Sequence, residues 1–561
     1  MKIRSKVQLY WNTIKYLQPI QIRYQIKNRI RRKINRHVLK DSCSSFELEI
    51  QEIRILIPEI DCEKEYLQRF DVNKLLDNYI ILLHEEHRIE NNWNIEDASH
   101  LWNYNLHYLE FLIPLAVQYI ETGEKQYFTK WKELIKSWLE HPSKDSFEPY
   151  TISMRIPNIL ICMEILRTEL RGTELERKLI ATIWQQYMYL LHTQELSLLA
   201  NHYFENLKTI VICSILFKEL SIYHKYYELF LEQIDEQILP DGIHFERSPM
   251  YHKIILEDIL RVYRVLYFSG YICDADKLMS VIHNMTMAMI ELERGFDRTP
   301  LFNDVGNNIS KSKQVLYKAI QKMYDFEETD KWSLEHSGYF KLSNQKCEIL
   351  FDCGDIGPSY MGGHSHCDCL SFELSVCGKV IFANSGTGQY QGELRSFFRS
   401  TAAHNTIMID RREQSELWGE HRVARRISNV KGAVKENRVI GSFRSYSGDY
   451  FRRQLTWEED GYLVISDGII PQDKNKHIAR QFFHLAPEYT YEHNDKKINI
   501  KKEEGIIATI RLPDICTYLI HTEGIITTSA EDFGKYLYKQ VLEVRTQFIG
   551  RIELKVEIEI R

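Results

Sequence analysis

The stretch KIILEDILRVYRVLYF, residues 253–268, places apolar side chains three and four positions apart along its whole length. That spacing predicts an amphipathic helix. The same period runs through WKELIKSWLE (131–140) and LKTIVICSILFKEL (207–220), and turn residues such as Pro240-Asp-Gly separate the helical stretches. Short loops of this kind favour antiparallel helix pairs. We therefore expect a helical region from about Asn92 to Tyr324.

The period changes to two after about Trp332. LSFELSV (370–376) and ELKVEIEI (553–560) alternate apolar and polar residues, and Glu459-Asp-Gly461 lies between QLTW and YLVIS. Alternation predicts strands, and the Asp-Gly pair predicts a hairpin turn between them. The C-terminal half is therefore expected to be an antiparallel β-sandwich.

Helices followed by strands indicate separate domains, not an alternating α/β sheet. We expect a multidomain α+β chain with its main boundary between residues 325 and 340. The predicted domains are an N-terminal helical extension (1–91), a helical domain (92–332) and a strand domain (333–561). A chain of 561 residues is long enough for several cores of this size.

Composition narrows the functional classes. Eleven cysteines without a paired pattern favour free thiols in a reducing compartment. The first residues lack an uninterrupted apolar segment, so we expect no signal peptide and a cytoplasmic location, with a periplasmic one as the alternative. No segment reaches transmembrane length. The net charge of -6 does not suggest nucleic-acid binding, so any acidic substrate must meet a local basic cleft.

One basic run stands out near the N-terminus. The residues from Ile22 to Arg36 (IRYQIKNRIRRKINR) could touch a membrane surface or an acidic polymer. A solvated helix face is the simpler interpretation.

Two polar clusters in the helical half concentrate ionisable residues. Asn201-His202 in LANHYFENLK precedes an apolar helix, where the asparagine could equally be a helix N-cap. DGIHFERSPMYHK (241–253) contains Arg247 and Tyr251 in a loop that opens a helix. A tyrosine there can act as a general acid or base, and the arginine can hold a carboxylate; the simpler alternative is a buried tyrosine with a satisfied hydroxyl.

Two further clusters lie in the strand half. In GGHSHCDCLSFEL (362–374), a period of two places His364, His366 and Asp368 on one face, which suits a metal site or a catalytic base. RSFFRSTAAHNTIMID (395–410) combines Arg395 and Arg399 with His404, as expected of an anion-binding wall. A lone histidine such as His404 is more often a hydrogen-bonded structural residue.

Taken together and in this order, the four clusters resemble the heparinase II/III family of polysaccharide lyases. Three supporting stretches are WNYNLHYLEFL (102–112), PYTISMRIPN (149–158) and FNDVGNN (302–308), and the resemblance covers about Trp102 to Leu485. It implies an incomplete (α/α) toroid followed by an antiparallel β-sandwich, with the cleft between them. It also implies an acidic polysaccharide, such as a glycosaminoglycan, as the substrate.

The expected reaction is β-elimination in a uronic-acid polymer. The enzyme must neutralise the carboxylate, remove the neighbouring proton and protonate the leaving glycosidic oxygen. By resemblance, Asn201 or His202 neutralises the carboxylate and Tyr251 is the general base and acid for one configuration. His364 is the base when the proton lies on the opposite face.

Further residues are expected to contact the substrate: Arg155, Arg247, Arg399, Asn105 and His107. In relatives a divalent metal, zinc or calcium, lies beside the cleft, and its ligand positions correspond here to His366, Asn384 and His404. Asn384 replaces the usual aspartate, and an amide is the poorer ligand. The tyrosine expected after Ser-Gly-Thr is replaced by Gly388, which could widen the cleft or shift specificity. No organic cofactor is expected.

Three alternatives remain open. A uronyl epimerase removes the same proton and returns it on the other face. A non-catalytic polysaccharide-binding protein of a capsule or exopolysaccharide system could keep the fold. A glycoside hydrolase would need two carboxylates, for which Glu205, Glu246 and Asp304 are candidates. Oligomeric state does not follow from the sequence.

Overall fold

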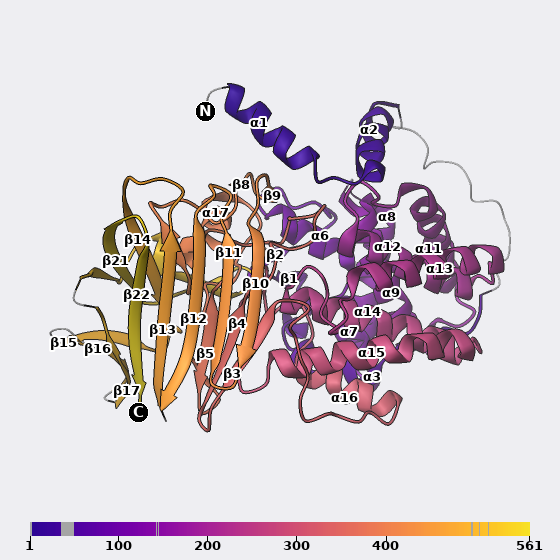
Figure 1. Cartoon of the computed structure of the whole chain (residues 1–561). Coiled ribbons are helices and arrows are strands. Elements are labelled where there is room, and N and C mark those ends of the chain that lie inside the picture. The colour runs from indigo at the N-terminus through magenta and orange to yellow at the C-terminus, as the bar shows by residue number, and fades with distance from the viewer. Residues whose placement is uncertain are drawn as a thin grey trace.

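The computed structural model describes residues 3–34, 50–141, 143, 145–459, 461–494, 497–503, 505–513 and 515–561. The N-terminal half is mainly helical, and the strands of the C-terminal half begin at Tyr339 (Figure 1). The last helix of the first half ends at Met323, so the change from helix to strand falls where the sequence period changes. Residues 35 and 36 of the basic run and Asp460 of the predicted hairpin turn lie outside the described residues.

The helical domain consists of helices that pack mainly on their neighbours in the chain. Its helices are α6 (His100–Tyr108), α7 (Leu112–Thr122), α8 (Lys125–Glu140), α9 (Pro149–Ile165), α10 (Arg167–Leu170), α11 (Glu174–Thr193), α12 (Ala200–Leu216), α13 (Leu220–Gln237), α14 (Pro249–Phe268), α15 (Ile272–Leu292) and α16 (Lys313–Met323). The pairs α7–α8, α12–α13 and α14–α15 are in contact, as short loops predict. All three quoted helical stretches lie in these helices, although α12 ends at Leu216.

Residues 50–91 are part of the helical domain and not a separate extension. They form α3 (Pro58–Asp61), α4 (Lys64–Leu67), α5 (Val72–Leu76) and a hairpin of β1 (Tyr79–Leu82) and β2 (Glu85–Arg88). Ile55, Ile60, Leu75 and Ile80 are buried in the same core as the helices of the domain. The strand pair was not expected. Its short apolar run alternates too briefly to be distinguished from a helix by period alone.

The C-terminal domain is built from antiparallel strands in layers. The largest sheet has the order β10 (Ser428–Lys435), β11 (Arg438–Arg444), β12 (Tyr450–Glu459), β13 (Tyr462–Ile470), β22 (Ile552–Ile560), β17 (Gly505–Arg511), β16 (Lys497–Lys502), β15 (Thr490–Asn494). Two four-stranded sheets accompany it: β18 (Thr517–His521), β21 (Val541–Ile549), β14 (Lys476–His484), β7 (Ile407–Ile409); and β3 (Tyr339–Ser343), β4 (Cys347–Asp352), β5 (Phe372–Val376), β6 (Lys379–Phe382). The sheets share one core, which confirms the predicted sandwich.

Small hairpins complete this domain and reach toward the helices. They are β8 (Leu417–Trp418) with β9 (Arg422–Val423) and β19 (Thr528–Asp532) with β20 (Lys535–Tyr538), and a short helix, α17 (Gly392–Phe398), precedes β7. β5 is buried along its whole length, although its sequence alternates, because its polar face also lies inside the protein. The predicted turn at Gly461 joins β12 to β13, with Gly461 at φ +87°.

Two N-terminal helices lie apart from both cores. α1 (Ile3–Ile14) and α2 (Pro19–Ile34) run along one edge of the molecule, above the junction of the two domains (Figure 1). Among the described residues, no helix has the length and apolar content that a membrane span requires. All ten described cysteines are free thiols, as predicted.

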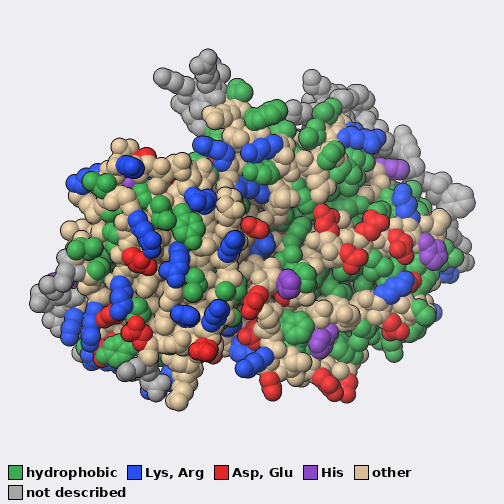
Figure 2. Space-filling view, viewed as in Figure 1, with side chains coloured by type: hydrophobic (Ala, Val, Ile, Leu, Met, Phe, Trp, Pro, Cys, Tyr) green, Lys and Arg blue, Asp and Glu red, His purple; other side chains and the backbone are tan. Residues whose placement is uncertain are grey.

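Charge is distributed unevenly over the surface. In the view of Figure 2, Lys and Arg side chains are spread over the strand domain, and Asp and Glu side chains gather on the helical domain. Although the net charge of the chain is -6, part of the surface of the strand domain is therefore basic, as the binding of an acidic substrate would require.

Candidate active site

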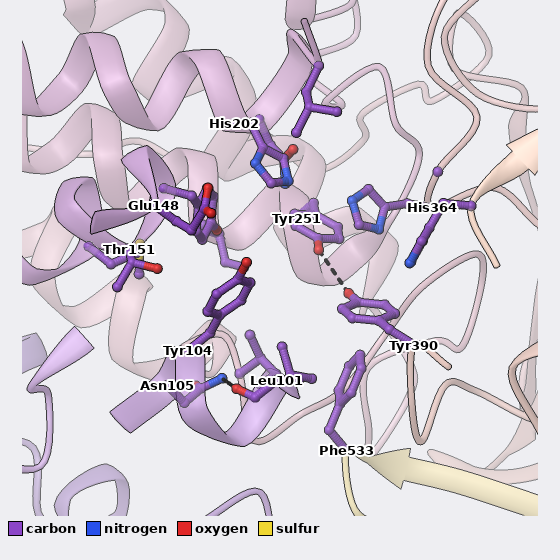
Figure 3. Close-up of a pocket in the computed structure, with 18 of the residues that line it drawn as sticks. Leu101, Tyr104, Asn105, Glu148, Thr151, His202, Tyr251, His364, Tyr390 and Phe533 are labelled. Atoms are coloured by element: carbon purple, nitrogen blue, oxygen red, sulfur yellow. Dashed lines mark hydrogen bonds between the residues drawn. The ribbon is translucent and has the colours of Figure 1, made fainter. Parts of the chain in front are cut away.

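A cavity of about 1990 Å³ lies where the helical domain meets the strand domain. The helical domain contributes Asn201, His202 and Tyr251 to its lining, and the strand domain contributes His364 and Tyr390. The structure thus brings together all four predicted catalytic residues, which are up to 163 residues apart in the sequence. Figure 3 shows three of them, His202, Tyr251 and His364, around one space.

The start of α12 presents Asn201 and His202. Leu199 and Ala200 adopt left-handed backbone angles, φ 63° and 50°, which turn the chain sharply into the helix. Asn201 follows this turn inside the helix, so the alternative that it is the N-cap is wrong. Its backbone N–H donates to Glu246 Oε1 (3.4 Å), while its buried side-chain oxygen has no hydrogen-bond partner among the described residues.

His202 is held by an acidic neighbour and an aromatic ring. Its Nδ1 lies 3.2 Å from Glu195 Oε1, and its ring lies 4.6 Å from that of Tyr150. Burial alone lowers the pKa of His202, but the Glu195 carboxylate outweighs burial and the pKa is raised. His202 therefore favours its cationic form at the cavity wall.

Tyr251 is fixed by the first turn of α14. Pro249 begins the helix, and the Ser248 hydroxyl caps it by accepting the Tyr251 N–H at 3.2 Å. The Tyr251 hydroxyl lies 2.8 Å from that of Tyr390, as the dashed line in Figure 3 marks. Burial raises the pKa of Tyr251 well above its ordinary value. Tyr251 is thus a neutral phenol that can donate a proton.

His364 rests on a buried carboxylate. Its Nδ1 lies 2.8 Å from Asp304 Oδ2, and its ring centroid lies 4.2 Å from that of Tyr251. Burial alone raises the pKa of Asp304, but the Arg395 guanidinium and two histidine hydrogen bonds hold it well below its usual range. Because Asp304 is ionised, the shared proton sits on His364 Nδ1, and the lone pair of Nε2 is left for a substrate.

Asp304 and Arg395 are the main residues that the sequence did not assign correctly. Arg395 donates to both carboxylate oxygens of Asp304, with Nη2 3.0 Å from Oδ2, and both side chains are fully buried. Arg395, which was expected to bind an anionic ligand, therefore binds the Asp304 carboxylate of the protein itself. Asp304 lies in FNDVGNN and Arg395 in RSFFRS, but nothing in either stretch of sequence shows that the two side chains meet.

A second cluster, His366, Asp368 and His404, lies behind the cavity wall. These are the residues whose ligand atoms come within 4.8 Å of one another in the described part of the chain. His366 Nδ1 is 3.2 Å from His404 Nε2, His366 Nε2 is 2.8 Å from Asp304 Oδ1, and His404 Nδ1 is 2.8 Å from the Ser400 carbonyl oxygen. The carboxylate and the carbonyl can only accept, so each ring carries its proton on that side. The two remaining lone pairs then face each other.

Asn384, the third predicted ligand, uses both polar atoms of its side chain in hydrogen bonds within the protein. Its side-chain oxygen accepts the Asn405 N–H at 3.0 Å, and its Nδ2 donates to the Ser371 hydroxyl at 3.3 Å. Asp368, which was expected only to support the metal ligands, is the acidic residue of the cluster with His366 and His404.

Among the expected substrate contacts, only Asn105 reaches the cavity. It lines the space, and its Nδ2 donates to the Leu101 carbonyl at 2.9 Å (Figure 3). His107 in α6 and Arg155 in α9 are fully buried, and Arg155 donates to Gln186 and to the His107 carbonyl. Their sequence neighbourhood suggested a cleft, but their donors are used inside the helical core.

Arg247 and Arg399 likewise lie outside the cavity lining. Arg247 Nε donates to the Ser337 carbonyl (2.7 Å) and so joins the helical domain to the first strands. Arg399 is buried and donates to the Ser365, Gly362 and Glu420 carbonyls, which holds the loop that carries His364. Both arginines position the site instead of facing a ligand.

Gly388 does not widen the cavity as expected. A side chain there would meet the Tyr536 ring at 2.4 Å, and both residues line the cavity. The Tyr536 hydroxyl also lies 3.2 Å from the Gly388 carbonyl oxygen, to which it donates. Tyr536 from β20 thus fills the space that a residue-388 side chain would take.

The carboxylates proposed for a hydrolase do not line the cavity. Asp304 is bound to Arg395, Glu205 pairs with Lys208 inside the helical core, and Glu246 is buried behind Asn201. A pair of acids flanking a glycosidic bond cannot be built from these three.

The fold and the site define a two-domain protein: a helical domain joined to an antiparallel sandwich, with a tyrosine and a histidine facing each other at the junction. The sequence profile of "Heparinase II/III N-terminus" matches residues 28–332, and that of "Heparinase II/III-like, C-terminal" matches residues 327–538. The chain therefore belongs to the heparinase II/III family, and its helical domain is the family's toroid.

Individual relatives agree with this assignment. The chain is 22% identical to a heparin-sulfate lyase of Bacteroides thetaiotaomicron over 67% of its own length and 60% of the relative's. It is 21% identical to a heparin-sulfate lyase of Pedobacter heparinus over 57% and 53% of the two lengths. The matches thus span less than two thirds of these relatives. A crystal structure of heparinase III superposes with a TM-score of 0.70 at 17% identity, covering 96% of this chain and 91% of that one.

Proposed function

We propose that this protein is a polysaccharide lyase that cleaves a uronic-acid-containing polymer by β-elimination. The observation that carries the proposal is the pair formed by Tyr251 and His364, with ring centroids 4.2 Å apart and Asp304 behind the histidine. One group can remove a proton, and the other can donate one. Both line the cavity together with Asn201 and His202.

The first task is to make the proton beside the uronate carboxylate acidic. Removing it builds negative charge on the carboxylate, which donors at that position stabilise. The Asn201 amide and the His202 cation supply such donors. In Asn201 the donor would be the side-chain Nδ2, since the amide oxygen can only accept hydrogen bonds.

The second task is the proton transfer itself. His364 accepts the proton at Nε2, since Asp304 keeps the other nitrogen protonated. Tyr251, held as a phenol by burial, gives its proton to the leaving glycosidic oxygen. For a uronate of the opposite configuration Tyr251 would serve as both base and acid, and the Tyr390 hydroxyl at 2.8 Å can then stabilise its phenolate.

The substrate class follows from the relatives and the cavity lining. The named relatives are heparin-sulfate lyases, so we propose a heparan-type glycosaminoglycan as the polymer. Arg422 and Arg426 line the cavity near β9 and can meet sulfate or carboxylate groups. Tyr104 and Tyr150 also line it and can cover the apolar faces of sugar rings.

We further propose a divalent cation at His366, Asp368 and His404. Two facing imidazole lone pairs and a carboxylate suit zinc better than calcium, which prefers oxygen ligands. Burial lowers the pKa of both histidines, so an extra proton between them is disfavoured. The cation would supply fixed positive charge that holds the loop presenting His364; none of its three ligands lines the cavity.

Metal content tests this site independently of activity. Purified protein loaded with zinc should retain about one equivalent after desalting. His366→Ala should lose the metal, and Asn384→Ala should keep it. Retention in both variants, or loss in both, would contradict the assignment of Asp368 over Asn384.

Product analysis in deuterated water tests the lyase against the epimerase. A lyase shortens the polymer and leaves an unsaturated uronate end, whereas an epimerase exchanges the proton for deuterium without cleavage. Adjacent proton-transfer groups, as Tyr251 and His364 are, suit removal and delivery at neighbouring sugar positions. Binding without either product would identify the non-catalytic alternative.

A further inference from the structure

The two N-terminal helices contact the rest of the protein largely through polar side chains. In α1, the Thr13 hydroxyl accepts a hydrogen bond from Trp418 Nε1 (2.9 Å), and the Tyr10 ring packs edge-on against Trp418 (4.8 Å). In α2, Gln21 Nε2 donates to the Leu198 carbonyl (3.1 Å), and Asn28 Nδ2 lies 3.3 Å from the Ser197 hydroxyl. α1 is thus attached to the strand domain and α2 to the helical domain.

Most of the described apolar side chains of both helices are exposed, although Leu9 of α1 is buried. Val7, Trp11 and Ile14 follow one another at helical spacing on α1 and are 63%, 69% and 43% exposed. Ile22 and Ile26 do the same on α2, at 37% and 56%. An amphipathic helix at a protein surface ordinarily buries this face against the core. Here the orientation is reversed, so the apolar faces lack a partner among the described residues.

The same segment is strongly basic in an acidic protein. Residues 1–40 contain twelve Lys and Arg and no Asp or Glu, whereas the whole chain carries a net charge of -6. Lys6, Lys15, Arg23 and Lys27 are exposed, and none of them forms an ion pair with another described residue. In Figure 2, apolar and basic side chains lie together along the edge formed by α1 and α2.

We propose that α1 and α2 dock this protein onto an anionic membrane surface. Exposed apolar side chains enter the boundary between headgroups and acyl chains, and Lys and Arg beside them attract anionic lipids. A soluble acidic polymer would satisfy the basic residues but would leave Val7, Trp11 and the isoleucines in water. The lipid surface is the partner that accounts for both features.

Docking in this way would place the cavity against the membrane. Tyr10, Ile14, Ile22 and Ile26 line the same cavity as Tyr251, so its wall continues into the docking face. If the proposed lyase function holds, the substrate is a polymer anchored at, or growing from, a membrane surface. The docking itself does not depend on catalysis.

Vesicle flotation of the full chain tests the proposal. Protein should float with phosphatidylcholine vesicles that contain phosphatidylglycerol, and much less with phosphatidylcholine alone. Trp11→Glu should lower the bound fraction roughly tenfold, because it places a charge in the apolar face. Ile549→Glu, at a position that is 67% exposed on β21, is the matched control and should bind as the wild type does.

Two further measurements separate the outcomes. Trp11 does not line the cavity, so Trp11→Glu should keep the wild-type rate on a soluble polymer. Lys15→Gln with Arg23→Gln should weaken only the binding to anionic vesicles. Flotation equal in wild type and Trp11→Glu, or no flotation with either vesicle, would overturn the proposal. So would loss of heparin-column retention in Lys15→Gln with Arg23→Gln while vesicle binding stays unchanged.

Discussion

The two walls of the cavity differ in how completely their polar groups are satisfied. On the strand side, Asp304 receives hydrogen bonds from His364, His366, Thr387 and Arg395. On the helical side, Asn201 Oδ1 and one oxygen of Glu195 lack partners among the described residues. His364 is therefore held rigidly on the strand side before substrate arrives, whereas Asn201 on the helical side is less tightly bound by its neighbours. Proton transfer uses both sides of the cavity, since Tyr251 belongs to the helical domain and His364 to the strand domain.

Breaking the strand wall should have the largest effect. Asp304→Asn leaves Arg395 buried without its counter-charge and should cost about 3–5 kcal/mol of unfolding free energy. It also releases His364 from its tautomer, so kcat should fall about 10⁴-fold. Denaturant unfolding and turnover measure the two effects.

Asp467→Asn is the matched control for this variant. Arg453 and Asp467 form another fully buried pair, with Arg453 Nε 2.7 Å from Asp467 Oδ1, and neither residue lines the cavity. Stability should fall comparably, but the folded enzyme should keep its kcat. Equal losses of kcat in both variants would show that Asp304 acts only through stability.

Tyr251→Phe should come next. The change removes one hydroxyl, so kcat should fall about 10³-fold because the leaving oxygen loses its acid. Unfolding free energy should change by no more than about 1.5 kcal/mol. Tyr227→Phe, which removes a buried hydroxyl 2.6 Å from the Asp274 carbonyl oxygen, should leave kcat unaltered. A Tyr251→Phe enzyme with wild-type kcat would exclude the assigned role.

The helical wall should respond less strongly. Asn201→Ala should lower kcat/KM about 10²-fold, since one donor to the developing charge is lost. Its unfolding free energy should hardly change, because the lost side-chain oxygen has no partner in the described structure. Asn103→Ala provides the contrast: Asn103 holds the Ile95 backbone through bonds of 2.9 Å and lies outside the cavity. It should lose stability and keep kcat/KM.

The smallest effect concerns the charge on His202. Because the Glu195 carboxylate raises its pKa, the His202 cation persists to a higher pH than that of an ordinary histidine and is lost as the pH rises through the pKa. KM for an acidic polymer should therefore increase severalfold on the alkaline side, by roughly the loss of one charge contact. His202→Gln should remove this increase. His477→Gln is the control, since His477 also has a raised pKa but lies away from the cavity. An unchanged alkaline increase in His202→Gln would assign the titration to another group.

Much of the fold could be predicted because the spacing of apolar residues along the chain differs between a helix and a strand that bury one face. The change from period 3.6 to period two located the domain junction, and the Gly461 turn was visible from its neighbours. Residues 50–91 were misjudged because their elements are short, and short apolar runs do not reveal which core they join. The reversed faces of α1 and α2 could not be predicted, since a pattern shows which side is apolar and not which side meets the protein.

Individual residues of the site could be predicted from the sequence, but the contacts between them could not. Tyr251 and His364 lie in dense polar clusters at element ends, where functional residues concentrate. Arg155, Arg399 and His107 have the same chemistry in sequence, yet their donors serve carbonyls and side chains inside the protein. Only the fold distinguishes an arginine that binds a ligand from one that binds a loop. The same holds for Asp304, whose partners are 60 to 91 residues away.

Ultraviolet absorbance of the unsaturated uronate product tests the central claim most directly. Purified protein is incubated with heparan sulfate, hyaluronan, alginate and a bacterial capsular polymer, beside Tyr251→Phe and Tyr227→Phe. We expect absorbance to rise with heparan sulfate in the wild type and in Tyr227→Phe, and not in Tyr251→Phe. A rise that persists in Tyr251→Phe, or no rise with any polymer, would contradict the proposed function.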